Sequence, residues 1–312
     1  MDHAVGNRPV RGEAISGAGG AIARLAQRAS IETSTRNVAD VAGYAPLVPA
    51  GTEVHVTFLP GTPYHHVLSV AARLRQVGLE PVPHLAARRF ASADAVADFA
   101  ARLREEAGVT RILLVAGDSA TGAGAFHSSL QVLETGVLQA CGIRRIGVAG
   151  YPEGHAKIPT AVLDEALERK IRLAEAHGID LFIVTQFCFD GEAVLDWMRR
   201  LRGRGITLPV RIGVAGPATA RTLLFYAMRC GIGASMKALG SGPVSLARLL
   251  DRRTPERLVA TLAPHADELG IDGLHVFPFG GFAESARWIA DAAGRTGVDE
   301  RKQDRQGIAL TG

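Results

Sequence analysis

The chain alternates between short apolar runs and longer stretches in which apolar residues recur three and four positions apart. A short run that is apolar throughout predicts a strand buried on both faces, and the longer spacing predicts an amphipathic helix, as at Val67, Val70 and Leu74. The eight predicted strands are residues 30–34, 53–58, 80–85, 111–116, 145–149, 181–186, 210–214 and 273–277. Their alternation with helices indicates an α/β protein with a parallel sheet.

The number of strands favours a closed barrel. Eight strand–helix units in one chain fit a single-domain (β/α)8 TIM barrel, whereas an open doubly wound sheet usually stops nearer six strands. We expect the barrel over residues 21–296, with two extra helices at 244–250 and 255–269 between strands seven and eight. The glycine- and alanine-rich residues 1–20 are expected to form a loose leader, and residues 297–312 a flexible tail.

Composition narrows the range of partners. The chain is 47% hydrophobic and 21% charged, which is typical of a soluble globular protein. Its net charge of +4 comes from scattered basic residues with no interleaved aromatics, so no nucleic-acid partner is expected. No apolar run reaches the roughly 18 residues that cross a bilayer, and three widely spaced cysteines indicate reduced thiols. We therefore expect a cytoplasmic protein that does not bind membranes.

Polar residues cluster at the carboxyl ends of the first six predicted strands, where barrels of this class carry their chemistry. These residues are Glu32, Thr57, His84, Gly117 with Asp118, Tyr151 with His155, and Gln186. Each alone has a structural explanation: Glu32 as an exposed edge residue, His84 as a hydrogen-bonded core histidine, and Asp118 as a turn cap. The convergence of six strands on one rim favours a site, because a buried Glu32 in a parallel barrel reaches solvent only through the mouth.

The remaining histidines and glycine-rich segment are weaker indications of function. The remaining histidines considered, His55, His65, His66 and His177, are interpreted as structural or surface residues. No helix carries ligands at metal-binding spacing and no HEXXH motif is present, so no metal is expected. The glycine-rich residues 117–124 can bring backbone N–H groups to a phosphate or ribityl chain, but they have neither the lysine of a P-loop nor the spacing of a Rossmann motif.

Two segments resemble the signature of methylenetetrahydrofolate reductases. They are GVAGYPEGH at 147–155 and IVTQFCFD at 183–190, with Arg169 and Lys170 between them, and weaker agreement runs from Ser30 to Trp288. The resemblance implies a TIM barrel that holds FAD across its carboxyl rim. It also implies reduction of 5,10-methylenetetrahydrofolate to 5-methyltetrahydrofolate with NADH or NADPH, in one-carbon metabolism and methionine biosynthesis.

The resemblance also implies a role for particular residues. Glu32 matches the general acid, Asp118 a catalytic carboxylate beside flavin and folate, Gln186 the glutamine that recognises the pterin, and Phe225 lies at a substrate-binding position. The flavin-contacting positions are Thr57, His84, Ala116, Gly117, Asp118, Tyr151, His155 and Lys170, with Phe126, His127 and Ser128 beyond the glycine loop. Opening the imidazolidine ring of the substrate requires a proton on a weakly basic nitrogen, which a buried glutamic acid can supply.

Three departures from the family pattern matter. Ala116 stands where the family often has arginine, which predicts weaker FAD binding. An apolar segment at 221–225 replaces the glutamine expected after strand seven, and residues 278–282 lack the arginine that holds the folate tail. The alternative is therefore an accessory barrel that binds folate or flavin without turnover, although a retained buried acid favours an enzyme. The direction of the reaction, the electron donor and a homo-oligomeric state stay open.

Overall fold

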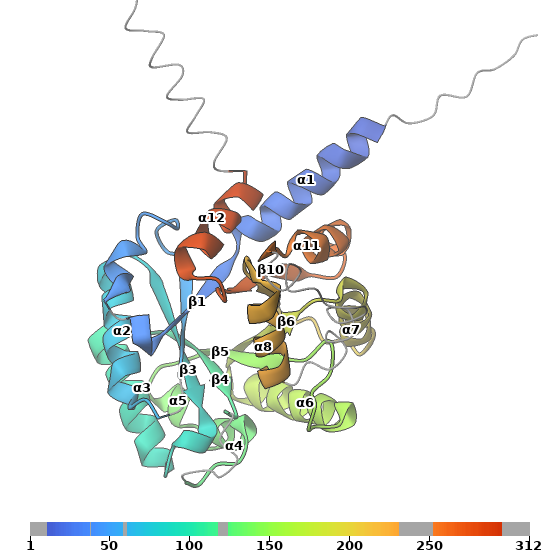
Figure 1. The fold of residues 1–312 in the computed structure, drawn as a ribbon. Helices are drawn as coiled ribbons and strands as arrows, with labels where there is room; N and C mark the ends of the chain where they lie inside the picture. The colour runs from blue at the N-terminus through green and yellow to red at the C-terminus, as the bar shows by residue number, and fades with distance from the viewer. Residues whose placement is uncertain (1–10, 38, 59–60, 118–123, 231–251, 295–312) are drawn as a thin grey trace, which may run out of the picture.

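The chain folds into the closed barrel that the strand count predicted. The computed structural model describes residues 11–37, 39–58, 61–117, 124–230 and 252–294. Eight parallel strands close in the order β1-β10-β7-β6-β5-β4-β3-β2, with helices around them (Figure 1). The (β/α)8 architecture is thus confirmed.

The strand boundaries differ from the predicted ones by at most two residues. The barrel strands are β1 Ser30–Ser34, β2 Glu53–Thr57, β3 Glu80–Ala86, β4 Arg111–Val115, β5 Arg145–Gly150, β6 Asp180–Cys188, β7 Val210–Ala215 and β10 Ile271–Phe277. A short antiparallel pair, β8 Ala218–Thr219 with β9 Arg252–Arg253, lies outside the barrel sheet. The agreement is close because strands buried on both faces are apolar along their length and end abruptly at polar or glycine residues.

The helices bury one apolar stripe each against the outer face of the barrel. They are α1 Arg11–Gln27, α2 Tyr64–Gln76, α3 Ala93–Ala107, α4 Ser129–Glu134, α5 Val137–Ala140, α6 Thr160–His177, α7 Gly191–Gly203, α8 Ala220–Cys230, α11 Glu256–Leu262 and α12 Phe282–Ala292. The outer core contains Val54 and Ile112 from the strands and Leu74 and Phe99 from the helices. None of these described helices is long and apolar enough to cross a membrane.

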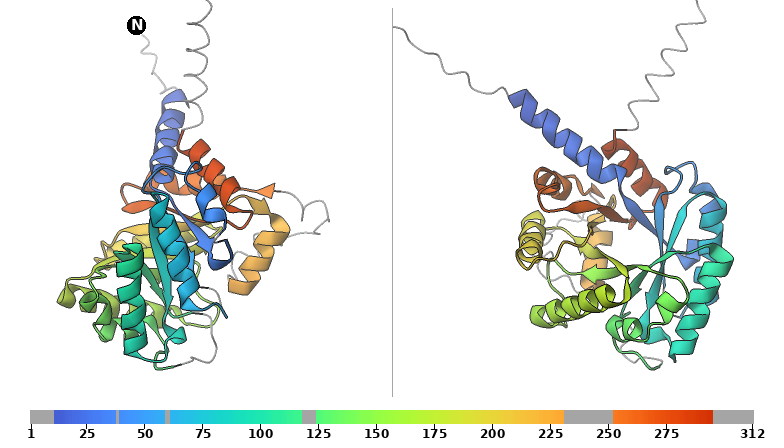
Figure 2. Two further views of the ribbon diagram at one scale, coloured as in Figure 1. Left: turned by 90° about the vertical axis from the view of Figure 1, so that its left-hand side faces the viewer. Right: turned by 180° about the vertical axis from the view of Figure 1, so that it is seen from behind.

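The amino-terminal segment differs from the expected loose leader. Helix α1 already begins at Arg11, and Figures 1 and 2 show its amino-terminal part projecting beyond the barrel. Its carboxyl half buries Ala21 and Leu25, and α1 contacts β10 and α12. The glycines of 11–20 lower local helix propensity, but this tertiary packing stabilises the helix.

The region between β7 and β10 contains extra helical structure, as the sequence predicted. The segment expected as an extra helix at 255–269 forms α11 and the 3-10 turn η4 Ala263–His265, and it contacts α7 and α1 in the outer layer. Helix α8 lies outside the layer of helices that surrounds the barrel, as the side view in Figure 2 shows. It buries Leu223 against residues that follow the carboxyl ends of the strands, including Phe189 and Phe279. The other expected helix, at 244–250, falls outside the described residues.

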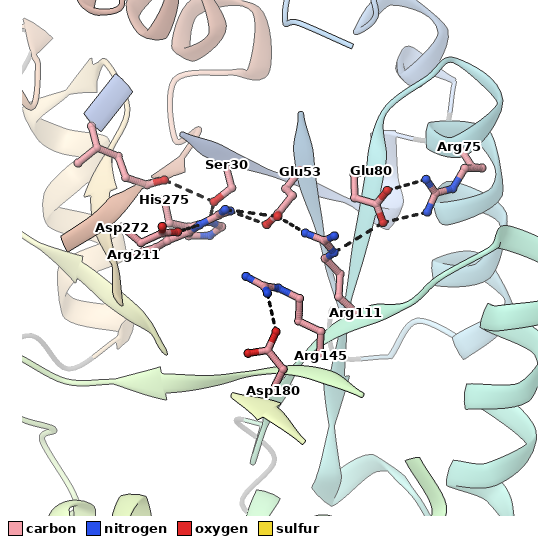
Figure 3. Close-up of polar contacts among 11 residues, drawn as sticks. Ser30, Glu53, Arg75, Glu80, Arg111, Arg145, Asp180, Arg211, Asp272 and His275 are labelled. Carbon is pink, nitrogen blue, oxygen red and sulfur yellow. Dashed lines mark hydrogen bonds and ion pairs between the residues drawn. The ribbon is translucent and has the colours of Figure 1, made fainter. Parts of the chain in front are cut away.

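Charged side chains fill the amino-terminal end of the barrel (Figure 3). Glu53 pairs with both Arg111 and Arg211, and Arg211 Nε also lies 3.3 Å from Asp272 Oδ2. Glu80 takes a double hydrogen bond from Arg75, at 2.6 and 2.9 Å. On the opposite side of the same layer, Arg145 Nη1 lies 2.5 Å from Asp180 Oδ2. These ion pairs, which we call the ionic layer, close the amino-terminal end of the barrel. The carboxyl end is left for a functional site.

Candidate functional site

A cluster of polar side chains surrounds Glu32 inside the barrel. Glu32 Oε1 lies 3.2 Å from His275 Nε2 and 3.5 Å from His84 Nε2. On its other side, His275 Nδ1 lies 2.9 Å from Ser30 Oγ. Strand register explains this meeting, because β1 pairs with both β10 and β2, and Glu32 stands beside His55. We call Ser30, Glu32, His55, His84 and His275 the Glu32 cluster.

The Glu32 cluster is almost completely buried, and burial lowers the pKa of two of its histidines. The side chain of Glu32 is 12% exposed, whereas His55 and His275 are completely buried. Burial lowers the pKa of His84 to about 4, against the opposing attraction of Glu32 and with a further decrease from His275. Burial also lowers the pKa of His55 well below its ordinary value. Both rings are therefore neutral at neutral pH.

The low pKa of His84 predicts that acid destabilises the fold. Between pH 6.5 and 4 the unfolded chain binds a proton at His84 that the folded chain does not, so stability falls as pH falls. We expect His84 to account for a loss of about 2 kcal/mol between pH 7.5 and 5. Urea unfolding of the native protein and of His84→Gln at both pH values measures this loss. An equal pH dependence in the two proteins would contradict it.

Gln186 lies near the carboxyl end of β6, and a backbone hydrogen bond fixes the orientation of its side-chain amide. The backbone N–H of Phe187 donates to Gln186 Oε1 at 3.1 Å, which identifies the oxygen of the amide. No described residue accepts a hydrogen bond from Gln186 Nε2. The half-buried amide thus offers hydrogen-bond donors to a ligand.

The loop after β5 is tied to the segment that follows β6. Glu153 Oε1 accepts hydrogen bonds from Phe189 N at 2.7 Å and from Asp190 N at 3.1 Å. Burial raises the pKa of Glu153, and these backbone donors oppose the increase. In the same loop the rings of Tyr151 and His155 lie edge to face, 5.3 Å apart. The structure therefore brings two of the flavin-contacting candidates together.

Arg88 joins the two ends of the glycine-rich loop, a role that was not predicted. It donates to the carbonyl oxygens of Gly117 and His127, both at 3.0 Å, and its own N–H bonds Ala116 O at 3.0 Å. Gly117 has φ +89°, a conformation that favours glycine. Asp118 lies outside the described residues, so its catalytic role stays a prediction.

The other candidates occupy different environments. Thr57 Oγ1 donates to Thr33 O at 2.7 Å, and Ser128 caps α4 in a capping box with Gln131. Phe126 is buried in the outer core, which leaves little of its ring for a cofactor. Phe225 is exposed on α8.

An aromatic group beside Gln186 was also missed by the sequence analysis. The ring of Phe187 lies 5.4 Å from that of Phe277 and 4.9 Å from that of Phe279, and Tyr226 of α8 stacks on Phe279 at 4.1 Å. Phe187 lies in β6, Phe277 ends β10, Phe279 follows it and Tyr226 lies on α8, so no local sequence pattern could have indicated that these rings meet. They supply apolar, flat surfaces near the carboxyl end of the barrel.

Lys170 on α6 is a candidate for an anionic ligand. Its ammonium group has no hydrogen-bond or ion-pair partner among the described residues, and burial lowers its pKa to about 8. A half-buried cation without a counterion is stabilised when a phosphate binds it. The described residues contain no group of three or more His, Cys, Asp or Glu side chains arranged for a metal ion.

The family model for methylenetetrahydrofolate reductase matches residues 47–233. Methylenetetrahydrofolate reductase 1 of Schizosaccharomyces pombe is 39% identical over 69 residues, and methylenetetrahydrofolate reductase 2 of Saccharomyces cerevisiae is 35% identical over 69 residues. Each match covers 22% of this chain and 11% of the yeast protein.

A solved structure with a similar fold is an uncharacterized protein from Clostridium thermocellum that binds two copies of 5-methyl-5,6,7,8-tetrahydrofolic acid. Its TM-score is 0.51 at 11% identity, over 85% of this chain and 93% of that one. At this identity the likeness shows the fold alone. The family model, in contrast, covers more than half of the chain, including β2 to β7 with both signature segments. The chain belongs to the methylenetetrahydrofolate reductase family.

Proposed function

We propose that the protein is a flavin-dependent methylenetetrahydrofolate reductase that interconverts 5,10-methylenetetrahydrofolate and 5-methyltetrahydrofolate. The observation that carries this proposal is Glu32, a nearly buried carboxyl group within 3.2 Å of His275 and 3.5 Å of His84. A site of this kind can transfer a proton to a substrate away from bulk water. Family membership supplies the reaction, and the folate-binding neighbour with the same fold is consistent with it.

Glu32 delivers the proton that opens the imidazolidine ring of the substrate. Its Oε1 is occupied by His275 Nε2, which leaves Oε2 for the substrate nitrogen. Ser30 bonds His275 Nδ1 and so holds the imidazole in the orientation that meets Glu32. The neutral His84 adds a polar neighbour without adding a competing positive charge.

Gln186 orients the pterin ring. Its Oε1 is held by Phe187 N–H, so its Nε2 recognises an acceptor such as a ring carbonyl or ring nitrogen. The aromatic rings of Phe277 and Phe279 lie close by and suit a flat heterocycle.

The described residues fit FAD in part. The unpaired Lys170 would meet the pyrophosphate, and Gly117, whose carbonyl oxygen accepts a hydrogen bond from Arg88, would present its backbone N–H to the cofactor. Ala116 offers no positive charge there, which is consistent with weak retention of FAD. Bound there, FAD would supply the hydride-transfer chemistry that links the nicotinamide to the folate.

An anaerobic titration tests the proposed function. The purified protein is incubated with FAD, and spectra are recorded after addition of NADH or NADPH and then of methylenetetrahydrofolate. We expect the flavin band to bleach with the nicotinamide and to return with folate. Protein that binds no FAD and transfers no electrons to folate would contradict the proposal, and folate binding without any spectral change would favour the accessory barrel.

Replacing Gln186 with leucine should weaken folate binding. The pterin acceptors would lose a donor in a site with little water, which costs about 1–3 kcal/mol of binding free energy. The midpoint potential of bound flavin should hardly change, since no charge is altered. Equilibrium binding of 5-methyltetrahydrofolate and potentiometry measure the two quantities. Unchanged folate affinity would remove Gln186 from the site.

A further inference from the structure

The end of β6 contains one residue more than its partner strand requires. Ile183 and Val184 pair with Val210 and Arg211 of β7, but the next registered pair joins Phe187 to Gly213. Between these pairs β6 advances by three residues and β7 by two. The extra residue forms a bulge, and bulges often re-aim a side chain beside an active site.

The side chain of Thr185 repairs the hydrogen bonding that the bulge interrupts. Gly213 N donates to Thr185 Oγ1 at 2.8 Å, so a hydroxyl replaces a backbone carbonyl as the acceptor. Thr185 Oγ1 in turn donates to the carbonyl oxygen of Gln186 at 2.9 Å. Thr185 is 1% exposed, so no water substitutes for these bonds.

Neighbouring groups complete the arrangement. Cys188 Sγ donates to the same Gln186 carbonyl at 3.1 Å, and burial raises the pKa of Cys188, which keeps the thiol protonated. At Gly213 a Cβ atom would lie 2.5 Å from Thr185 O and 2.7 Å from Gln186 O, so only glycine permits this approach of the two strands. The backbone of Gln186 is therefore held by side chains on both sides of it.

We propose that Thr185 is a positioning residue for Gln186: its hydroxyl, bridging Gly213 N–H and the Gln186 carbonyl, holds the bulge that presents the Gln186 amide as a donor to the substrate. The substrate group addressed is a hydrogen-bond acceptor on a flat heterocycle. This inference rests on the proposed function for the identity of that heterocycle. The geometry of the bulge does not depend on it.

Two replacements of Thr185 test the effect of its hydroxyl group separately from the effect of its side-chain shape. Thr185→Val keeps the branched side chain and removes the hydroxyl, whereas Thr185→Ser keeps the hydroxyl. We expect Thr185→Val to raise the Kd for 5-methyltetrahydrofolate about tenfold, and Thr185→Ser to change it by less than about twofold. In the Gln186→Leu background, Thr185→Val should raise the Kd for 5-methyltetrahydrofolate by less than a further factor of about two, because both changes remove the same contact.

The outcomes distinguish this inference from the proposed function. If Gln186→Leu weakens folate binding and a folded Thr185→Val does not, the inference is wrong and the proposed function stands. If the unaltered protein does not bind folate, the proposed function fails, and crystal structures of the ligand-free variants decide the inference. The Phe187 N–H bond to Gln186 Oε1 must then be lost in Thr185→Val and kept in Thr185→Ser. If Thr185→Val does not fold, Cys188→Ala takes its place, because Cys188 bonds the same Gln186 carbonyl. We expect Cys188→Ala to bind 5-methyltetrahydrofolate two- to threefold more weakly, and an unchanged affinity overturns the inference.

Discussion

Replacing Glu32 with glutamine is expected to slow the folate half-reaction by roughly a hundredfold or more, the usual scale for loss of a general acid. Glutamine keeps the size of the side chain and a contact to His275, but it has no acidic proton to donate. Reduction of FAD by the nicotinamide needs no such proton and should keep its rate. Stopped-flow spectroscopy of the two half-reactions measures both.

A control comes from Glu192, an exposed carboxylate in the first turn of α7. Glu192→Gln should leave both half-reactions unchanged. If Glu32→Gln slowed both half-reactions equally, Glu32 would be a structural residue and the acid would have to be another group.

Replacing Glu53 with glutamine is expected to cost about 3–5 kcal/mol of unfolding free energy, the range for removing one partner of a buried ion pair. Glu53 is 13% exposed and compensates two arginines, of which Arg211 is also 13% exposed. Without Glu53, the carboxylate left to Arg111 among the described residues is Glu80 at 3.8 Å, and the one left to Arg211 is Asp272 at 3.3 Å. Urea denaturation at neutral pH measures the loss.

The matched control is the pair of Arg102 and Glu106 on the surface of α3, 2.7 Å apart and 36% and 47% exposed. Glu106→Gln should cost less than about 1 kcal/mol, because solvent screens an exposed pair. A similar cost for both variants would mean that the ionic layer is solvated and does not hold the barrel together.

The acid site was only partly predictable. Glu32 and His84 were candidates because they lie at strand ends, but His275 was not singled out and His55 was assigned a structural role. Each histidine stands between two apolar residues of a predicted strand, and this signal was present in the sequence. The contact of His275 with Glu32 depends on closure of the barrel between β1 and β10, which joins residues 243 positions apart, whereas His55 lies beside Glu32 through the pairing of β1 with β2.

The strands, the class of fold and the family could be predicted from the sequence, because the strand–helix alternation and the two signature segments are local patterns. The strand register became known from the folded structure, and with it the ionic layer around Glu53, the Glu32 cluster and the bulge before Phe187. The same holds for α8, whose apolar stripe specifies burial but not the surface that buries it. These features join side chains from different strands, and periodicity along one strand carries no information about which neighbour another strand will place beside it.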